Sequence, residues 1–425
     1  PLFGSAHVFY TIEFRDSLNR TIAKWIIKIP VNGTPDTWDK LCAETLRTEA
    51  LTLYMIASET SIPVPEIIDA DSSPHNDLHA PYLIMEYVEG TTLDQVWFRQ
   101  DDEDEIRVRE RRTKVLKGLA KSMLQLGKFE FERGGAPWFD EVGVLVGVGP
   151  SRELDVQAMI DRWFGNEDCE KGPLYAEMQT VEDAVEMYTA LLDLYPCDTE
   201  ASKGVDKLLR TLIKFIREPS GSTSLRERMK FVLTHPGLNL RNIIISEKGD
   251  VKAILGWDGV RAAPRSLGNE MLPSWLIRDF NPFVWRWQPS PEFWRNRGRK
   301  EDDEEAAGNR FEDAPWVLRQ LRDEYESIIQ GLKKEDGIGD SDVNITKQSL
   351  LALSLDTAVR DPRSRAPILR RILEKCSRMT EKFDFDAIVE VLGNDGQLDG
   401  YKLRCLERNF RELVDRGYVR GAVVW

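Results

Sequence analysis

The sequence has few of the residues that form metal and redox sites. Among its 425 residues are 5 cysteines and 4 histidines. No two cysteines form a Cys-x-x-Cys pair, and no histidine is paired with a cysteine at the spacing of zinc ligands. We therefore expect no metal site, and the odd, scattered set of cysteines indicates a reduced, cytoplasmic protein.

An excess of basic charge is also absent, as is any long apolar run. The chain carries 58 Lys and Arg against 72 Asp and Glu, a net charge of -14. Binding to nucleic acid or to an anionic membrane needs a basic face, and a membrane span needs about 20 apolar residues. We expect neither partner. The hydrophobic fraction of 41% is enough to bury the cores of two or three packed units.

Strand-like and helical patterns divide the chain near residue 90. Before it, alternating or continuous apolar runs predict strands at residues 8–14, 23–29 and 82–87, and helical spacing predicts a helix at 41–58. Beyond it the pattern is mostly helical. Helices are expected at residues 107–128, 181–195, 201–217, 316–332, 345–359 and 366–379.

One stretch interrupts the helical part. LTHPGLNLRN runs into two short strands expected at residues 243–246 and 251–255, around a turn at 248–250. The second strand leads into Gly256, Trp257 and Asp258. A hairpin with polar residues at both ends, inside a helical region, is a candidate site of chemistry.

These motifs resemble the aminoglycoside phosphotransferases of the protein-kinase-like family. LTHPGLNLRNIII followed by ILGWDGV resembles the family's catalytic loop, His-x-Asp-x-x-x-x-Asn, and its metal strand, Ile-Ile-Asp-Trp. Lys28 in WIIKIP looks like the strand lysine, Glu49 in LRTEALTLYMIASE like its helix partner, and MEYVEG like the hinge. The loop IPVPEII looks like the fungal members. The resemblance covers essentially the whole chain.

The resemblance implies an α+β, two-lobed fold of the kinase-like type. A small sheet-and-helix lobe is expected over residues 1–90. A larger, mainly helical lobe is expected over residues 91–425, carrying the catalytic-loop-like segment 233–258. The cleft between the lobes is then the expected site.

The sequence departs from the family at its two essential aspartates. Gly237 stands at the catalytic-base position, and Gly256 stands at the metal-ligand position. Loss of a general base costs roughly 10²- to 10⁴-fold in rate, and loss of a metal anchor removes several kcal/mol of charge stabilisation. We expect inefficient phosphoryl transfer and a cleft that is roomier by two side chains.

Neighbouring side chains are the candidates for any remaining chemistry. We assign possible catalytic roles to His235, Asn239, Asn242 and Asp258. Asp258 follows Gly256 by two residues, so in an extended strand both would face the same side, and a shifted metal site is conceivable. The structural alternatives are a loop-orienting His235, a loop-bracing Asn242 and a turn carboxylate at Asp258.

The cofactor position of the family corresponds to Lys28, Glu49, Met85 and Tyr87. A structural ion pair between Lys28 and Glu49 is the alternative to a working phosphate clamp. We expect no cofactor, with ATP and Mg²⁺ needed only if weak phosphotransfer persists.

Aromatic residues are dense after Gly256, which favours a flat apolar ligand if one or two of them line a pocket. They are Trp257, Trp275, Phe280, Phe283, Trp285, Trp287, Phe293 and Trp294. The expected substrate-binding residues are Gly237, Gly256, Trp257, Trp275, Arg278 and Asp279.

Three functions remain open. The first is a small-molecule-binding protein, one form of which is a repurposed enzyme of fungal specialised metabolism that confines a substrate for cyclisation, condensation or rearrangement. The second is a non-catalytic, pseudokinase-like scaffold. The third is a weak ATP-dependent phosphotransferase that uses Asp258 and Asn242.

Overall fold

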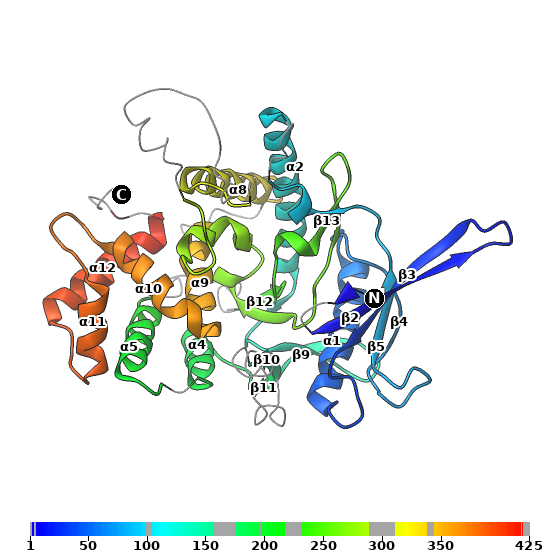
Figure 1. The fold of residues 1–425 in the computed structure, drawn as a ribbon, viewed down its shortest axis with the longest axis horizontal. Coiled ribbons are helices and arrows are strands. Elements are labelled where there is room, and N and C mark those ends of the chain that lie inside the picture. Colours follow the sequence, from blue (N-terminus) through cyan, green and yellow to red (C-terminus); the bar gives the residue numbers. More distant parts are fainter. Residues whose placement is uncertain are drawn as a thin grey trace. The chain divides into compact units, whose positions relative to one another are not determined.

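The chain forms two compact units. The computed structural model describes residues 2–3, 6–98, 104–155, 175–195, 197–216, 231–288, 311–337, 344–417 and 419. Unit 1 comprises residues 1–93, 121–183 and 228–264, and unit 2 comprises residues 94–120, 184–227 and 265–425 (Figure 1). The sequence predicts a single boundary near residue 90. The first boundary between the units follows residue 93, but residues 121–183 and 228–264 belong to unit 1 again.

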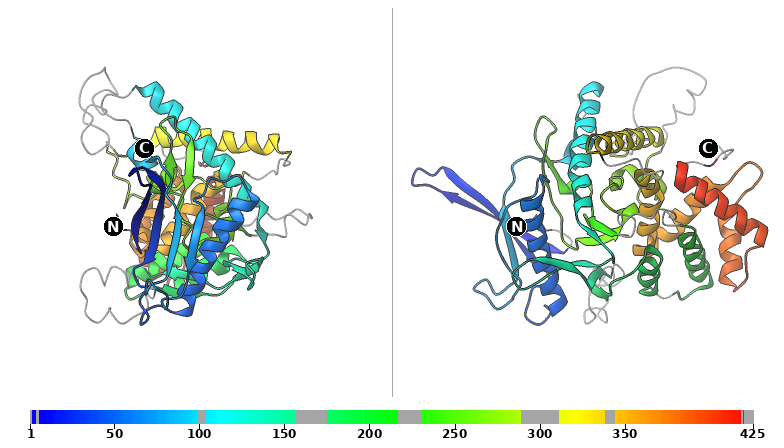
Figure 2. Two further views of the ribbon diagram at one scale, coloured as in Figure 1. Left: turned by 90° about the vertical axis from the view of Figure 1, so that its right-hand side faces the viewer. Right: turned by 180° about the vertical axis from the view of Figure 1, so that it is seen from behind.

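Unit 1 contains every strand of the described residues. Its largest sheet is antiparallel with the order β1-β2-β3-β5-β4. The strands are β1 (Leu2–Phe3), β2 (His7–Arg15), β3 (Thr21–Pro30), β4 (Ile67–Asp71) and β5 (Tyr82–Glu86). Helix α1 (Lys40–Glu59) packs against β4 and β5, and the tip of the β2–β3 hairpin projects beyond the sheet (Figures 1 and 2).

Shorter sheets complete unit 1. Their orders are β15-β12-β7, β14-β13-β6, β8-β9 and β10-β11. The bounds are β6 (Thr91–Thr92), β7 (Glu130–Phe131), β8 (Ala136–Phe139), β9 (Leu145–Gly149), β10 (Ser151–Leu154), β11 (Tyr175–Met178), β12 (Phe231–Thr234), β13 (Ile243–Ile245), β14 (Val251–Ile254) and β15 (Arg261–Pro264). Helix α1 also contacts β8 and β10, which brings these hairpins to the side of the main sheet.

The regular elements in the described part of unit 2 are helices, joined by turns and irregular segments. Its helices are α2 (Glu105–Leu124, whose last turn belongs to unit 1), α4 (Ala184–Asp193), α5 (Glu200–Phe215), α8 (Pro315–Glu335), α9 (Ile345–Arg360), α10 (Pro362–Cys376), α11 (Phe385–Gly393) and α12 (Gly400–Arg416), with the 3-10 helix η6 (Ser274–Phe280). Helix α9 is central, since it contacts α4, α5, α8, α10 and α12. None of the helices in the described ranges is both long and apolar enough to cross a membrane.

The α+β class predicted from the sequence is confirmed. Each expected strand and helix is present, with bounds shifted by a few residues, because the apolar spacing that predicts it also forms the buried face. The strands β7 to β11 were missed where a mostly helical pattern was expected. They are short and only partly buried, so their sequences contain no sustained alternation of apolar and polar residues.

Candidate functional site

Lys28 and Glu49 form a buried ion pair in unit 1. Lys28 lies near the end of β3, paired with Leu83 of β5, and Glu49 lies in the middle of α1. The ammonium donates to both carboxylate oxygens, at 2.8 and 2.7 Å. Burial raises the pKa of Glu49, and the Lys28 charge opposes that rise. Removal of one partner from such a pair costs about 3–5 kcal/mol, because the other charge is left buried and unpaired.

The other two residues expected at the cofactor position lie along β5 and just after it. Met85 is two residues from Leu83 and therefore on the same face of the sheet as Lys28. The amide of Tyr87 donates to the Lys24 carbonyl at 3.0 Å, and the Lys24 ammonium lies 3.7 Å from the Tyr87 ring centroid. Neither side chain has a described hydrogen bond to the Lys28–Glu49 pair.

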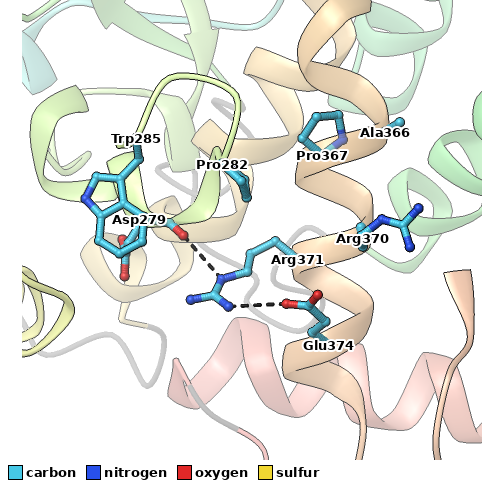
Figure 3. A pocket seen from close by; sticks show the side chains of 8 residues that line it. All are labelled: Asp279, Pro282, Trp285, Ala366, Pro367, Arg370, Arg371 and Glu374. Carbon is cyan, nitrogen blue, oxygen red and sulfur yellow. Dashed lines mark hydrogen bonds and ion pairs between the residues drawn. The ribbon is translucent and has the colours of Figure 1, made fainter. Parts of the chain in front are cut away.

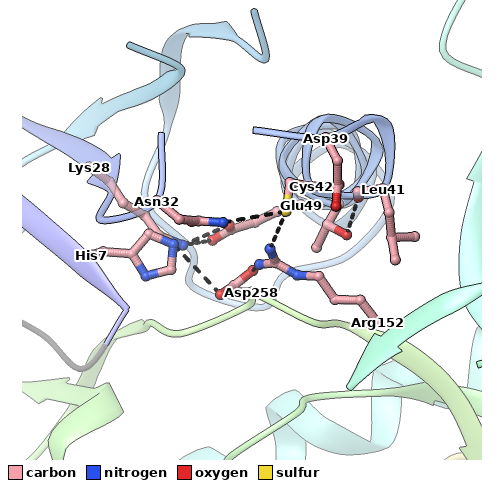
Figure 4. A network of polar contacts seen from close by, with 10 residues as sticks. His7, Lys28, Asn32, Asp39, Leu41, Cys42, Glu49, Arg152 and Asp258 are labelled. Carbon is pink, nitrogen blue, oxygen red and sulfur yellow. Dashed lines mark hydrogen bonds and ion pairs between the residues drawn. The ribbon is translucent and has the colours of Figure 1, made fainter. Parts of the chain in front are cut away.

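Asp258 joins the same cluster through Arg152 (Figure 4). Arg152, from β10, contacts Asp258 Oδ1 through Nη2 at 3.2 Å and approaches the Cys42 sulfur at 3.5 Å. The Arg152 guanidinium also lies 4.0 Å from the ring centroid of Tyr175. Burial acts to raise the pKa of Asp258, but the charges of Lys28 and Arg152 outweigh it, and the pKa is lowered. Asp258 is therefore an anion held by cations.

His7 completes a polar cluster of unit 1 without adding charge. The other members of this cluster are Lys28, Glu49, Arg152 and Asp258. Its Nε2 lies 3.6 Å from Asp258 Oδ2. Burial, followed by the Lys28 charge, lowers the pKa of His7 to about 3, so the imidazole is neutral at pH 7. Two cations and two carboxylates then balance: Lys28 and Arg152 against Glu49 and Asp258.

Arg152 and Tyr175 were not predicted from the sequence. Both lie in the β10–β11 hairpin, where Glu153 is opposite Ala176 and Leu154 is opposite Tyr175. A single arginine and a single tyrosine, in short strands, form no pattern. Only the packing of β10 against α1 and the contacts of Arg152 with Asp258 and Tyr175 identify them.

The loop after β12 is held by its own side chains. The His235 Nε2 lies 2.8 Å from the Leu255 carbonyl, and its Nδ1 accepts from the Gly237 amide at 3.1 Å. This network assigns the Nε2–H tautomer. The Gly237 carbonyl accepts from the amide nitrogens of Asn239 at 3.1 Å and Asn242 at 2.8 Å. The donors of these residues thus stabilise the loop rather than face a substrate.

Trp257, expected to contact a substrate, is a core residue. Its indole is 1% exposed and donates to the Ile254 carbonyl at 2.9 Å. The ring packs edge-on against His235 with centroids 4.7 Å apart. Burial of both rings explains why the pKa of His235 is lowered, to about 4.

The two glycines differ in the space around them. A Cβ on Gly237 would have its nearest neighbour 4.0 Å away, at Asn239 Nδ2. At Gly256 the backbone φ is +81°, and a Cβ would lie 2.5 Å from Asn242 Nδ2. The expectation of room for two side chains is therefore wrong at Gly256, because the Asn242 amide already occupies that space.

The backbone from Gly256 to Asp258 is not the extended strand on which the shifted metal site depended. Strand β14 ends at Ile254, and Asp258 lies in a turn closed by the Val260 amide on the Trp257 carbonyl at 3.1 Å. The positive φ of Gly256 redirects the backbone. Asp258 therefore does not lie on the same face of a strand as Gly256, and the prediction of a shifted metal site that depended on this is wrong. Among the described residues, no group of three or more His, Cys, Asp or Glu could hold a metal ion.

The remaining predicted substrate residues lie in unit 2. Trp275 is 4% exposed and packs edge-on against Trp97. Arg278 pairs with Glu312, and Asp279 accepts two hydrogen bonds from Arg322, at 2.7 and 3.2 Å. Trp275 is thus a core residue, and the charged side chains of Arg278 and Asp279 are committed to ion pairs. Phe293 and Trp294 lie outside the described residues.

Comparison of sequences yields a weak relative. No protein-family model matches the chain. The curated protein named altered inheritance of mitochondria protein 9, mitochondrial, from Candida glabrata is 21% identical over 316 residues, which is 61% of this chain and 48% of the relative. The chain spans about half the length of that relative.

Solved structures similar to the chain are phosphotransferases. A thermostable mutant of aminoglycoside phosphotransferase APH(4)-Ia is 13% identical with a TM-score of 0.39 and covers 97% of this chain and 92% of that one. Plasmodium vivax ethanolamine kinase is 13% identical with a TM-score of 0.39, covering 93% and 81%. Macrolide 2'-phosphotransferase type I is 10% identical with a TM-score of 0.38, covering 99% and 89%.

The likeness extends over nearly the whole chain. At these identities and TM-scores the likeness carries no conclusion about the activity of this chain.

Proposed function

We propose that this chain is a kinase-like protein that does not transfer phosphoryl groups efficiently and that binds a small organic molecule beside the polar cluster of unit 1. The observation that carries the loss of transfer is at Gly256. There the metal-binding carboxylate is replaced by a glycine whose side-chain space is filled by Asn242. The site has thus lost the carboxylate and also the room for it.

The loss of the catalytic base adds to this effect. Gly237 has no proton acceptor, and the amides of Asn239 and Asn242 cannot act as bases at neutral pH. Loss of a general base costs roughly 10²- to 10⁴-fold. Loss of the metal anchor lowers the rate further, by about tenfold for every 1.4 kcal/mol of transition-state stabilisation that is lost.

Asp258 is a poor replacement for the metal ligand. Its carboxylate is already held by Arg152, with Lys28 and His7 close by. A divalent cation would have to displace the Arg152 guanidinium from Asp258 and would then be repelled by the Lys28 charge. This argues against weak phosphotransfer through Asp258 and Asn242.

A small-molecule ligand fits the remaining chemistry best. The side chain of Asp258 is 26% exposed, whereas Lys28, Arg152 and His7 are each 10% exposed or less. A ligand would therefore meet a recessed set of donors around one accessible carboxylate. The net charge of -14 argues against nucleic acid as the alternative partner.

Finer hypotheses rest on the sequence. They are a repurposed enzyme of fungal specialised metabolism, a pseudokinase-like scaffold, and a cytoplasmic location. The name of the Candida glabrata relative contains the word mitochondrial, so fractionation of cells that express the full-length protein would test the location.

Nucleotide turnover and binding test the loss of transfer. We expect no ATP hydrolysis above a protein-free blank. Any rise in melting temperature with ATP should be the same with and without Mg²⁺, because the described residues contain no group of three or more His, Cys, Asp or Glu that could hold a metal ion. Gly237→Asp alone should restore little, since the metal position still lacks its carboxylate.

The contrary outcome is specific. Mg²⁺-dependent turnover by the unaltered protein that is abolished by Asp258→Asn would overturn this proposal in favour of the weak phosphotransferase. Exposed Asp77, changed to Asn, is the matched control.

Ligand binding is tested separately by native mass spectrometry after incubation with fungal metabolite extract. We expect an added mass that is lost in Arg152→Leu and kept in Asp77→Asn. If no added mass is found for the unaltered protein, the scaffold function is favoured instead.

A further inference from the structure

A pocket lies entirely within unit 2 and shares no residue with the polar cluster of unit 1. It lies between the segment that follows η6 and helix α10 and has a volume of about 500 Å³. Its lining residues are Asp279, Pro282, Trp285, Ala366, Pro367, Arg370, Arg371 and Glu374 (Figure 3). The volume is within the range of small-molecule sites, roughly 300–1,000 Å³.

One side of this pocket is flat and apolar. The indole of Trp285 is half-buried, and its Nε1 donates to the Asp313 carbonyl at 3.3 Å, which fixes the ring. Trp287 stacks with Trp285 at a centroid distance of 5.8 Å and an interplanar angle of 21°. Pro282 and Pro367 add two rigid rings. A planar apolar group could bind here with little loss of side-chain entropy.

Arg371 provides the polar contact. Figure 3 shows its side chain extending from α10 toward Asp279 and Trp285, whereas Arg370 points away from Trp285. Arg371 Nε donates to the Asp279 carbonyl at 3.3 Å, and Nη1 contacts Glu374 at 3.2 Å. Arg370 is held by Asp386 at 2.7 and 2.8 Å. Arg371 is therefore the lining cation aimed into the pocket.

The contact between Arg371 and Glu374 is exchangeable. The Glu374 side chain is 45% exposed, and an ion pair at that exposure contributes about 0–1 kcal/mol. The Asp279 carboxylate cannot replace it, because Arg322 holds both of its oxygens. An incoming anion could therefore take Arg371 from Glu374 at small cost, and a planar carboxylate would match the fork of the guanidinium.

Positive charge exceeds negative charge around Arg371. Lys375, one turn further along α10, has its pKa lowered by burial and then by the charges of Arg371, Arg319 and Arg322, with Asp279 opposing them. The lining also contains Arg370, which is held by Asp386, and the carboxylates Asp279 and Glu374. Among these described side chains, five cations (Arg319, Arg322, Arg370, Arg371 and Lys375) stand against three carboxylates (Asp279, Glu374 and Asp386), which makes this part of unit 2 favourable for an acidic group although the whole chain is acidic.

We propose that this pocket binds a planar, apolar molecule with one acidic group. The flat part lies against Trp285 and the two prolines, and the acidic group replaces Glu374 on Arg371. The site is independent of the one proposed in unit 1, since no residue is shared.

Calorimetric titration with indole-3-carboxylate and its neutral amide, indole-3-carboxamide, tests the proposal. We expect the carboxylate to bind at least about 10-fold more tightly than the amide. Indolyl phosphate distinguishes a carboxylate site from a phosphate site. Tighter binding of the phosphate would assign phosphate monoesters as the natural class, and the acidic group would still be required.

Variants locate the site. Trp285→Ala and Arg371→Leu should each weaken carboxylate binding by about 10-fold or more, and Arg404→Gln, an exposed position on α12, should leave it unchanged. Glu374→Gln should strengthen binding by about 3- to 10-fold, because it removes the competitor for Arg371. A gain of affinity cannot come from misfolding.

Three results would overturn the inference. They are equal binding of acid and amide, no effect of Glu374→Gln, and no heat of binding for any probe up to about 1 mM.

Discussion

At Gly256 any side chain would meet two penalties, because the backbone conformation disfavours L-residues and Asn242 occupies the adjacent space. We predict that Gly256→Ala lowers the free energy of unfolding by about 1–3 kcal/mol, because an L-residue is disfavoured at φ +81° and its Cβ would meet Asn242. Gly237→Ala, with open space around it, should change the free energy by less than about 1 kcal/mol. Urea denaturation measures both.

A double-mutant cycle separates strain from crowding. Asn242→Ala alone removes the hydrogen bond to the Gly237 carbonyl. In the Gly256→Ala background it also removes the clash, so it should cost less there than in the unaltered protein. If the effects of the two substitutions on the unfolding free energy are additive, Asn242 does not occupy the space beside Gly256.

His235 links stability to pH. Its folded pKa of about 4 is below the unfolded value of 6.5, because burial disfavours the imidazolium. The stability it contributes is present above pH 6.5 and is lost as pH falls toward 4, because there the unfolded chain binds the proton first. Between these two pKa values, the slope of the unfolding free energy against pH approaches about 1.4 kcal/mol per pH unit.

Comparison with His235→Gln isolates this contribution. The difference in unfolding free energy between the two proteins should shrink between about pH 7 and pH 4, measured by denaturant titration at each pH. His75→Gln, at an exposed position, should follow the unaltered protein. A difference that stays constant with pH would mean that His235 is not buried in its neutral form.

At the scale of elements, α5 and α11 pack closely in unit 2 through facing glycines (Figure 1). A Cβ on Gly204 would lie 2.1 Å from the Val389 carbonyl, and one on Gly393 would lie 2.3 Å from the Glu200 carbonyl. Gly204→Ala should therefore destabilise by about 1–3 kcal/mol, although alanine favours helix.

Gly331 in α8 is the control for this prediction. A Cβ at this position would have no neighbouring atom within 4 Å, so Gly331→Ala should stabilise by about 0.5–1 kcal/mol through helix propensity alone. Thermal and urea unfolding measure both changes. A stabilising Gly204→Ala would show that the two helices are not in backbone contact.

For the whole molecule, the net charge predicts which class of partner is disfavoured. With 58 basic and 72 acidic side chains, the chain should not bind DNA or RNA more tightly than about 10⁻⁴ M at 0.15 M salt, measured by mobility shift. Titration at about 0.05 M salt is the internal control, since weak electrostatic binding would emerge there first. Micromolar binding at the higher salt concentration would contradict the prediction.

The sequence alone determined the features that depend on local order. Apolar spacing located α1, α5 and α9 because the same spacing forms the buried face of each helix. The loop and hairpin at residues 231–254, and the absence of carboxylates at Gly237 and Gly256, were also evident from a continuous run of residues.

Only the tertiary structure decided which distant side chains meet. Arg152 reaches Asp258 across 106 positions, and Asn242 fills the space beside Gly256. The pocket of unit 2 brings together Trp285 and Arg371, which no pattern connects. The reason is physical: periodicity reports which face of an element is buried, whereas the partner of a single charged or aromatic side chain depends on long-range packing.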